Sequence, residues 1–315
     1  MQVPNLDQPR PDQAARGLAA LLDDALAPWF AVLDGGLFDD LPGDLLRQGI
    51  ACRSLFLDHA DREVEQAGPW LVAADEDRAR RHVVDLTVAQ PCAVFWGGAE
   101  GDLALWRHLR TLNEVLIPAE TVQDGGDGSG RGRERVLFRH WDPNVLASVL
   151  PLLDAAQLAR VLGPARSIVM NAPDYGGLTE VPRPSDLPPP RGPLRLAQDQ
   201  MEELKGAMLH ASRLRIARFL KSSIQAPLPE VSDDYLWRAT LASEPTADEL
   251  GLRTEQGRAR WTYLLAMSGG QVAAIPEVRA FIREGGASPD DQMKALMGHA
   301  ITAMRGYDPG PGRMP

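Results

Sequence analysis

The 315-residue sequence contains only two cysteines, Cys52 and Cys92. Each lies in a short apolar run, residues 51–57 and 91–96, where a thiol usually packs as a small hydrophobic side chain. The sequence therefore gives no sign of the disulfide framework that stabilises small secreted domains.

Long apolar runs are also missing. None approaches the roughly 20 residues that a helix needs to cross a bilayer. The first ten residues lack the basic segment and apolar stretch of a secretory signal. We therefore expect a soluble, cytoplasmic protein without membrane insertion.

Basic residues are fewer than acidic ones. The chain has 33 Lys+Arg against 43 Asp+Glu, a net charge of −10, which repels phosphate backbones. Nucleic acid is therefore not an expected partner. With 44% hydrophobic residues the chain can still bury a substantial core, and its length suggests roughly two domains.

The common catalytic and metal-binding motifs are absent. Ser129 has Asp127 and Arg131 where a Gly-x-Ser-x-Gly elbow requires glycines, and the glycine-rich segment 124–132 lacks the Gly-Lys-Ser/Thr ending of a phosphate loop. The six histidines do not occur in His-x-x-x-His spacing, and the chain has no Cys-x-x-Cys. We expect no catalytic residue, metal or cofactor, and interpret residues 124–132 as a solvated hairpin loop.

One triplet, His140-Trp141-Asp142, allows two interpretations. It could supply a His-Asp pair for acid–base chemistry, but no nucleophile accompanies it. Asp142 followed by Pro143 is also typical of a helix start, with Asp as the cap and Pro at the first helical position. The second interpretation accounts for Asp142 without chemistry.

Apolar periodicity predicts the fold of the first 172 residues. Short apolar runs typical of strands alternate with helical patterns, and the run 91–96, bounded by Pro91 and Gly97-Gly98, is typical of a strand covered on both faces. Residues 114–118 and 134–139 are predicted to pair around the glycine-rich loop. Residues 1–172 are therefore predicted to form a mixed α/β lobe in which helices flank a mixed sheet.

Prolines crowd residues 173–193, where neither a helix nor a central strand can run through. We interpret this segment as a linker. Beyond it, helical patterns at 194–222, 232–241 and 254–267, and another from residue 288, predict an all-helical lobe over residues 194–315. The predicted fold class is thus mixed α/β (α+β), with a sheet lobe first and a helical lobe second.

Methionines recur at helical spacing in the second lobe. Their usual role is core packing, and an adaptable partner-binding surface is the alternative. The basic second half of the helix 194–222 is explained by the helix dipole or by binding. The candidate partner-binding residues are Met201, Met208, Arg215, Met293 and Met297.

Several blocks occur in a fixed order along the first lobe. They are Trp-Phe-Ala-Val-Leu-Asp-Gly-Gly at 29–36, Cys-Arg-Ser-Leu-Phe at 52–56, Ala-Gly-Pro-Trp-Leu-Val at 67–72, Trp-Arg-His-Leu-Arg at 106–110, a block at 136–146 that contains Phe-Arg-His-Trp-Asp-Pro-Asn-Val-Leu, and Leu-Gly-Pro at 162–164. Together they resemble the DUF4123 domain family over about residues 28–168. The block that contains Arg139, Asp142 and Pro143 is the most specific.

The resemblance implies a mixed α/β lobe in a bacterium with a type VI secretion apparatus. Members of the family are adaptor-chaperones that bind a cognate effector and help to load it onto the VgrG spike, without catalysis. The family-motif residues Asp34, Gly35, Trp70, Arg139, Asp142 and Pro143 are expected to be structural. Two alternatives stay open: an immunity protein that neutralises a toxin, and an enzyme with a dispersed site.

Overall fold

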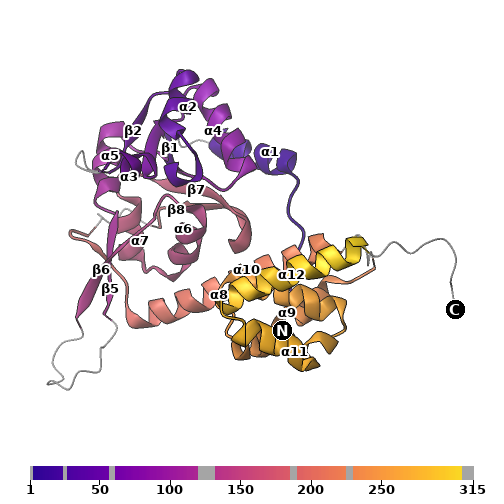
Figure 1. The fold of residues 1–315 in the computed structure, drawn as a ribbon. Coiled ribbons are helices and arrows are strands. Elements are labelled where there is room, and N and C mark those ends of the chain that lie inside the picture. Colours follow the sequence, from indigo (N-terminus) through magenta and orange to yellow (C-terminus); the bar gives the residue numbers. More distant parts are fainter. Residues whose placement is uncertain are drawn as a thin grey trace. The chain divides into compact units, whose positions relative to one another are not determined.

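The computed structural model describes residues 3–23, 27–56, 61–119, 132–184, 190–224 and 230–306, with side chains up to residue 299. The chain divides into two compact units, Gln8–Met208 and Met1–Asp7 together with Leu209–Pro315 (Figure 1). The first contains the strands and the second is helical, so the predicted mixed α/β class is confirmed. No helix among the described residues is both long and apolar enough to cross a membrane.

The first unit contains a six-stranded antiparallel sheet. Its strand order is β2 (Cys52–Ser54), β3 (Pro69–Ala73), β1 (Trp29–Asp34), β4 (Ala93–Gly97), β7 (Ser167–Ala172) and β8 (Gly177–Pro182). Every residue of the central strands β1 and β4 is buried. The run at 91–96 is therefore a strand covered on both faces, as predicted.

Helices cover both faces of this sheet. The evidence is that alternate residues of β1 belong to two different buried clusters, one on each face. Phe30 and Val32 join one cluster, whereas Trp29, Ala31 and Leu33 join the other. The helices packed in the first cluster are α5 (Asp102–Arg110), α6 (Pro143–Val149) and α7 (Ala155–Leu162), and those in the second are α1 (Pro11–Asp23), α2 (Leu41–Arg47) and α4 (Asp77–Ala89). The shorter helical segments of this unit are η1 (Gly35–Leu37), α3 (Arg62–Gln66), η2 (Leu150–Leu152) and η3 (Pro173–Tyr175).

A second sheet has three strands in the order β6 (Arg133–Leu137), β5 (Glu114–Pro118) and β9 (Leu194–Arg195). β5 pairs antiparallel with β6, which confirms the predicted strand pair, although β6 ends two residues before the predicted end. β5 pairs parallel with β9. The glycine-rich loop predicted between β5 and β6 lies outside the described residues except for Gly132.

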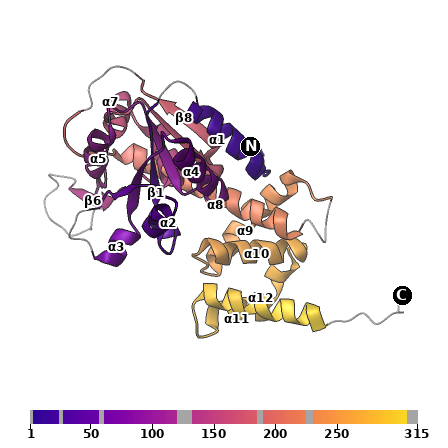
Figure 2. The same ribbon diagram turned by 90° about the horizontal axis from the view of Figure 1, so that it is seen from above.

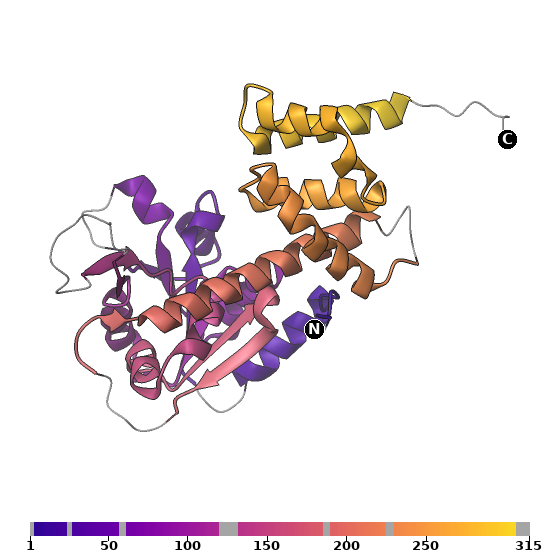
Figure 3. The same cartoon turned by 90° about the horizontal axis from the view of Figure 1, so that it is seen from below.

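The boundary between the units differs from the predicted one. The segment interpreted as a linker, 173–193, contains η3 and β8, and β8 pairs along its whole length with β7 (Figure 3). Prolines exclude a central strand, but β8 lies at the sheet edge, where Pro182 is tolerated. The next residues form β9, and α8 (Gln198–Ile224) begins in the first unit, so the division falls at Met208 and Leu209.

The second unit contains the end of α8 with α9 (Asp233–Glu249), α10 (Glu255–Met267), η4 (Gln271–Ala274), α11 (Pro276–Glu284) and α12 (Pro289–Gly306). α10 packs against both α9 and α12, as Figure 2 shows. The N-terminal segment belongs to the same unit. Leu6 is buried among Leu214, Leu220 and Trp237, and Asp7 accepts a hydrogen bond from Lys221 at 2.7 Å.

Candidate functional site

The turn after β1 is enclosed by the chain that leads into β3. The carboxylate of Asp34 is 3% exposed and accepts a hydrogen bond from the amide of Gly36 at 3.1 Å. The amide of Gly35 donates to the carbonyl of Gly68 at 2.9 Å, and a Cβ on Gly35 would overlap the carbonyl oxygens of Gln66 and Gly68. Glycine is therefore required at position 35 by close backbone approach.

The strongest sequence block forms the entry to α6. Asp142 caps this helix, since its Oδ1 accepts hydrogen bonds from the amides of Asn144 at 2.9 Å and Val145 at 3.4 Å. Pro143 occupies the first helical position. The predicted cap is confirmed, and because Asp142 points at backbone amides, its position does not favour an acid–base role.

Arg139 joins these two regions. Its Nη2 forms an ion pair and hydrogen bond with the buried carboxylate of Asp34 and lies 3.6 Å from Oδ2 of Asp142. Trp70 borders the same turn and donates from Nε1 to the carbonyl of Gln66 at 3.3 Å. The motif residues thus form one junction, termed here the Asp34 junction, made of Asp34, Gly35, Trp70, Arg139, Asp142 and Pro143.

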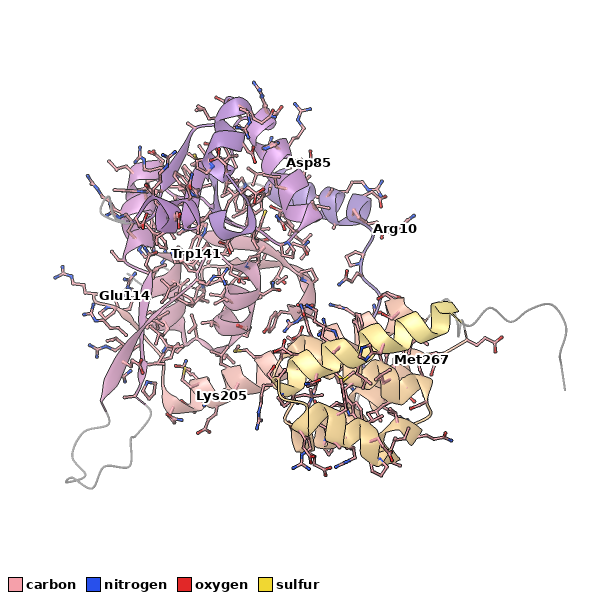
Figure 4. All side chains as sticks on the ribbon, viewed as in Figure 1. Arg10, Asp85, Glu114, Trp141, Lys205 and Met267 are labelled. Carbon is pink, nitrogen blue, oxygen red and sulfur yellow. The ribbon has the colours of Figure 1, made fainter. Side chains whose placement is uncertain are left out.

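Two histidines near this junction are held neutral. His140 is fully buried, its Nε2 lies 3.1 Å from Oδ1 of Asn113, and burial lowers its pKa to about 3. Its ring packs against Trp96, Phe138 and Trp141 at centroid distances of 6.3, 6.2 and 5.1 Å. Trp141 is labelled inside the unit in Figure 4.

His108 lies closer to the surface. Its Nε2 is 2.9 Å from the carbonyl of Val161, and burial lowers its pKa to about 4. The left-handed Gly163 lies against this ring, and a Cβ there would overlap it. Both imidazoles are therefore uncharged near neutral pH and are positioned by packing.

Neither cysteine is an activated nucleophile. Burial raises the pKa of Cys92 to about 12 and also raises that of Cys52. Since the thiolate is the reactive form, both side chains are suited to packing. Within the described ranges, no group of three or more His, Cys, Asp or Glu side chains is placed to hold a metal ion.

A groove of about 1000 Å³ opens on the first unit. Its walls come from the residues after β2, the end of α5, the β5–β6 hairpin and residues 190–193. Phe56 and Leu137 provide apolar surface, and Leu137 is 59% exposed. Glu114, labelled in Figure 4 at the base of the hairpin, lies on its rim.

The groove is basic although the protein is acidic. Among the described residues, its charged lining consists of Arg110, Arg135, Arg160 and Arg191 against Glu114 alone. Arg135 pairs with Glu114 at 2.9 Å. Arg160 is 8% exposed and donates to the carbonyls of Gly192 at 2.7 Å and Thr111 at 3.2 Å, which fixes the wall formed by residues 190–193.

Residues 29–160 match the family model described as Domain of unknown function (DUF4123). The chain carries a DUF4123 domain. The match includes the whole Asp34 junction, both neutral histidines and Arg160, whereas Arg191 and the helical unit lie beyond it. No curated protein and no solved structure matches the chain.

The helical unit beyond the DUF4123 domain has a separate cavity of about 520 Å³. Its main cations are paired: Arg213 donates two hydrogen bonds to Glu244 at 2.6 Å each, and Arg258 pairs with Asp248. Arg215, a predicted partner-binding residue, forms a bidentate pair with Glu255. This cavity therefore has little uncompensated charge.

The methionines predicted as partner-binding residues differ in their burial. Met293 is fully buried and Met297 partly buried in a core cluster of the helical unit. Met201 packs on a core of the first unit, Gln8–Met208, termed here the DUF4123 unit because it contains the matched residues 29–160. Met293 cannot contact a partner in this conformation, so its assignment is corrected to core packing. Met208 is 55% exposed. Helical spacing could not separate these cases, because core and binding methionines share it.

The arginines of the groove were not predicted from the sequence. Arg110 is within a quoted family block, but Arg160 and Arg191 stand in segments interpreted only as helix and linker. The net charge of −10 hides this local basic cluster. No spacing signal brings together residues 110, 160 and 191, so the groove could be found only in the folded chain.

Proposed function

We propose that this protein is a non-catalytic adaptor-chaperone that binds a cognate type VI secretion effector in the cytoplasm and helps to load it onto the VgrG spike. The observation that carries the proposal is the DUF4123 domain at residues 29–160, which contains the complete Asp34 junction. The resemblance to this family implies the adaptor role, and the groove supplies a surface on which a protein segment can bind.

The chemistry of the unit supports binding rather than catalysis. The titratable groups with large pKa shifts, Cys92, His108 and His140, owe them chiefly to burial. In an active site such shifts would belong to groups that converge on one open pocket. Of these three groups His108 lines the groove, whereas His140 and Cys92 lie in the two separate cores that flank the sheet, so the three do not converge on one pocket.

The test is affinity purification of the tagged full-length protein from its native bacterium, with mass spectrometry of the bound proteins. An effector and VgrG should be enriched over a tagged unrelated cytoplasmic protein. Deleting the gene should stop secretion of that effector while other substrates of the apparatus are still secreted. Undiminished secretion of every effector would refute the proposal.

A second experiment separates the adaptor from an immunity protein. The gene is expressed in a susceptible cell that the effector enters. An adaptor is needed only in the cell that fires, so the recipient should die as fast as one carrying an empty vector. Protection of the recipient would favour toxin neutralisation and contradict the adaptor role.

A further inference from the structure

The groove of the DUF4123 unit holds cationic charge without a matching anion. No carboxylate among the described residues pairs with Arg110, Arg160 or Arg191. Arg160 is bonded to neutral groups only, the carbonyls of Gly192 and Thr111 and the hydroxyl of Thr111 at 2.8 Å. Arg110 lies over the ring of Trp106 at 4.3 Å. Glu114, the acidic residue that the described part of the chain places on the rim, is already paired with Arg135.

Such a cluster is notable in a chain with ten more acidic than basic residues. Several arginines outside the groove have carboxylate partners, as in the pairs Arg213–Glu244 and Arg279–Glu249 at 2.6 and 2.9 Å. Unpaired charges of one sign around one groove repel each other, and an anionic ligand relieves this repulsion. Stacking on Trp106 also orders the guanidinium of Arg110 in advance, so less side-chain entropy is lost on binding.

The groove also has an apolar part. Successive side chains of β6 point to opposite faces of the sheet. Val136 packs against the core, so the other face carries Arg133, Arg135 and Leu137. Leu137 is therefore on the outer face, and it is 59% exposed. Phe56 is half-buried and meets Trp141 edge to face at 5.8 Å, which fixes its ring. The ligand must therefore combine anionic and apolar groups.

We infer that this groove binds an extended acidic segment of a protein partner, with carboxylates on Arg110 and Arg191 and apolar side chains on Phe56 and Leu137. The inference rests on the proposed adaptor function, since the segment would belong to the carried effector. Arg160 has a positioning role: it ties residues 190–193, and with them Arg191, to the end of α5.

An acidic peptide fits better than a nucleic acid. A nucleic acid carries a phosphate at every residue, and its chain would continue past the groove across a protein whose net charge is −10. A peptide can confine its carboxylates to the groove and place apolar side chains between them. Because the groove is positive while the protein as a whole is negative, partners that are acidic over their whole surface would be repelled by the rest of the protein.

The experiment selects random 12-residue displayed peptides against the immobilised full-length protein and measures the affinity of the most enriched peptide by fluorescence polarisation. The test variant is Arg110→Glu/Arg191→Glu. Its matched control, Arg107→Glu/Arg195→Glu, makes the same charge change at exposed positions of α5 and β9 outside the groove. Arg191→Glu alone serves as a second test variant, because Arg191 is exposed in an irregular segment and its replacement spares the fold.

Enriched peptides should carry several Asp or Glu residues among apolar ones. The double groove variant should weaken binding by about tenfold or more, the single variant by a smaller factor, and the control should not change it. Added salt should weaken binding to the wild type. Enrichment without acidic residues, or equal affinities for the groove and control variants, would overturn the inference. So would a labelled single-stranded oligonucleotide that binds the groove more tightly than any selected peptide.

The two proposals can fail separately. If the pull-down recovers an effector and the groove variant still binds it with full affinity, the adaptor function stands and the groove assignment is wrong. If acidic peptides bind at the groove but no effector depends on this protein for secretion, the groove assignment stands and the adaptor function is wrong.

Discussion

Acid should destabilise the DUF4123 unit through its two buried histidines. Folding lowers the pKa of His108 to about 4 and that of His140 to about 3, whereas an unfolded imidazole titrates near 6.5. Between these values the unfolded chain binds more protons than the folded one, so stability falls as pH falls. The full stability is present above about pH 6.5. At about pH 5 each histidine should cost about 2 kcal/mol, or about 4 kcal/mol together.

The assay is urea denaturation at several values between about pH 7.5 and 5, followed by tryptophan fluorescence, because Trp96 and Trp141 contact His140 directly. The variant His108→Gln/His140→Asn removes both titrating groups and should flatten the loss of stability over this range, whatever its stability at neutral pH. His210→Gln, at an exposed position of the helical unit, is the control and should keep the wild-type slope. If the double variant loses stability with acid as steeply as the wild type, the reasoning is refuted.

Three further changes test the packing. Asp142→Ala removes the cap of α6 and should lower the free energy of unfolding by about 1 kcal/mol in urea denaturation, whereas Asp142→Asn should keep most of the wild-type stability. An unchanged urea midpoint for Asp142→Ala would contradict the capping role. Gly35→Val should reduce the soluble yield of folded protein, because its side chain would overlap two backbone carbonyls, whereas Gly206→Val, which meets open space, should be tolerated in the same expression trial. Leu6→Ala should lower the free energy of unfolding by about 2–4 kcal/mol, because Leu6 is 3% exposed in the core of the helical unit. Thermal unfolding monitored by circular dichroism measures this, and a loss of stability no greater than that of Leu209→Ala, at an exposed position, would show that the N-terminal segment does not pack in that core.

Local signals in the sequence predicted the elements whose causes are local. The continuous apolar run of β4, the cap at Asp142 and the pairing of β5 with β6 around a glycine-rich segment each depend on neighbouring residues. The domain boundary was not predictable in the same way. Prolines at 173–193 indicate where a central strand is impossible, but they do not distinguish a linker from an edge strand such as β8. Pairing with β7, a tertiary effect, decides between them.

The candidate site shows the same limit more strongly. Asp34 and Arg139 are separated by 105 residues, and their pairing follows only from the packing of β1 beside the entry to α6. The groove depends on residues 110, 160 and 191, which share the property that none has an anionic partner among the residues that the structure describes. Whether a charge is compensated depends on its distance from other charges in the folded chain. The composition therefore gives the net charge but not the place where unpaired charges gather.

Comparing the Asp34 junction with the groove also indicates which residues should determine partner specificity. Every polar member of the Asp34 junction is already engaged within the chain: Asp34 with Arg139 and Gly36, Asp142 with Arg139 and two helix amides, and Trp70 with a backbone carbonyl. Such residues maintain the fold of the domain and have few interactions left to offer a partner. Arg110 and Arg191 have interactions to offer, and replacing them costs the fold little. If the proposed adaptor function holds, changes in the groove should therefore alter the partner while the junction keeps the domain folded.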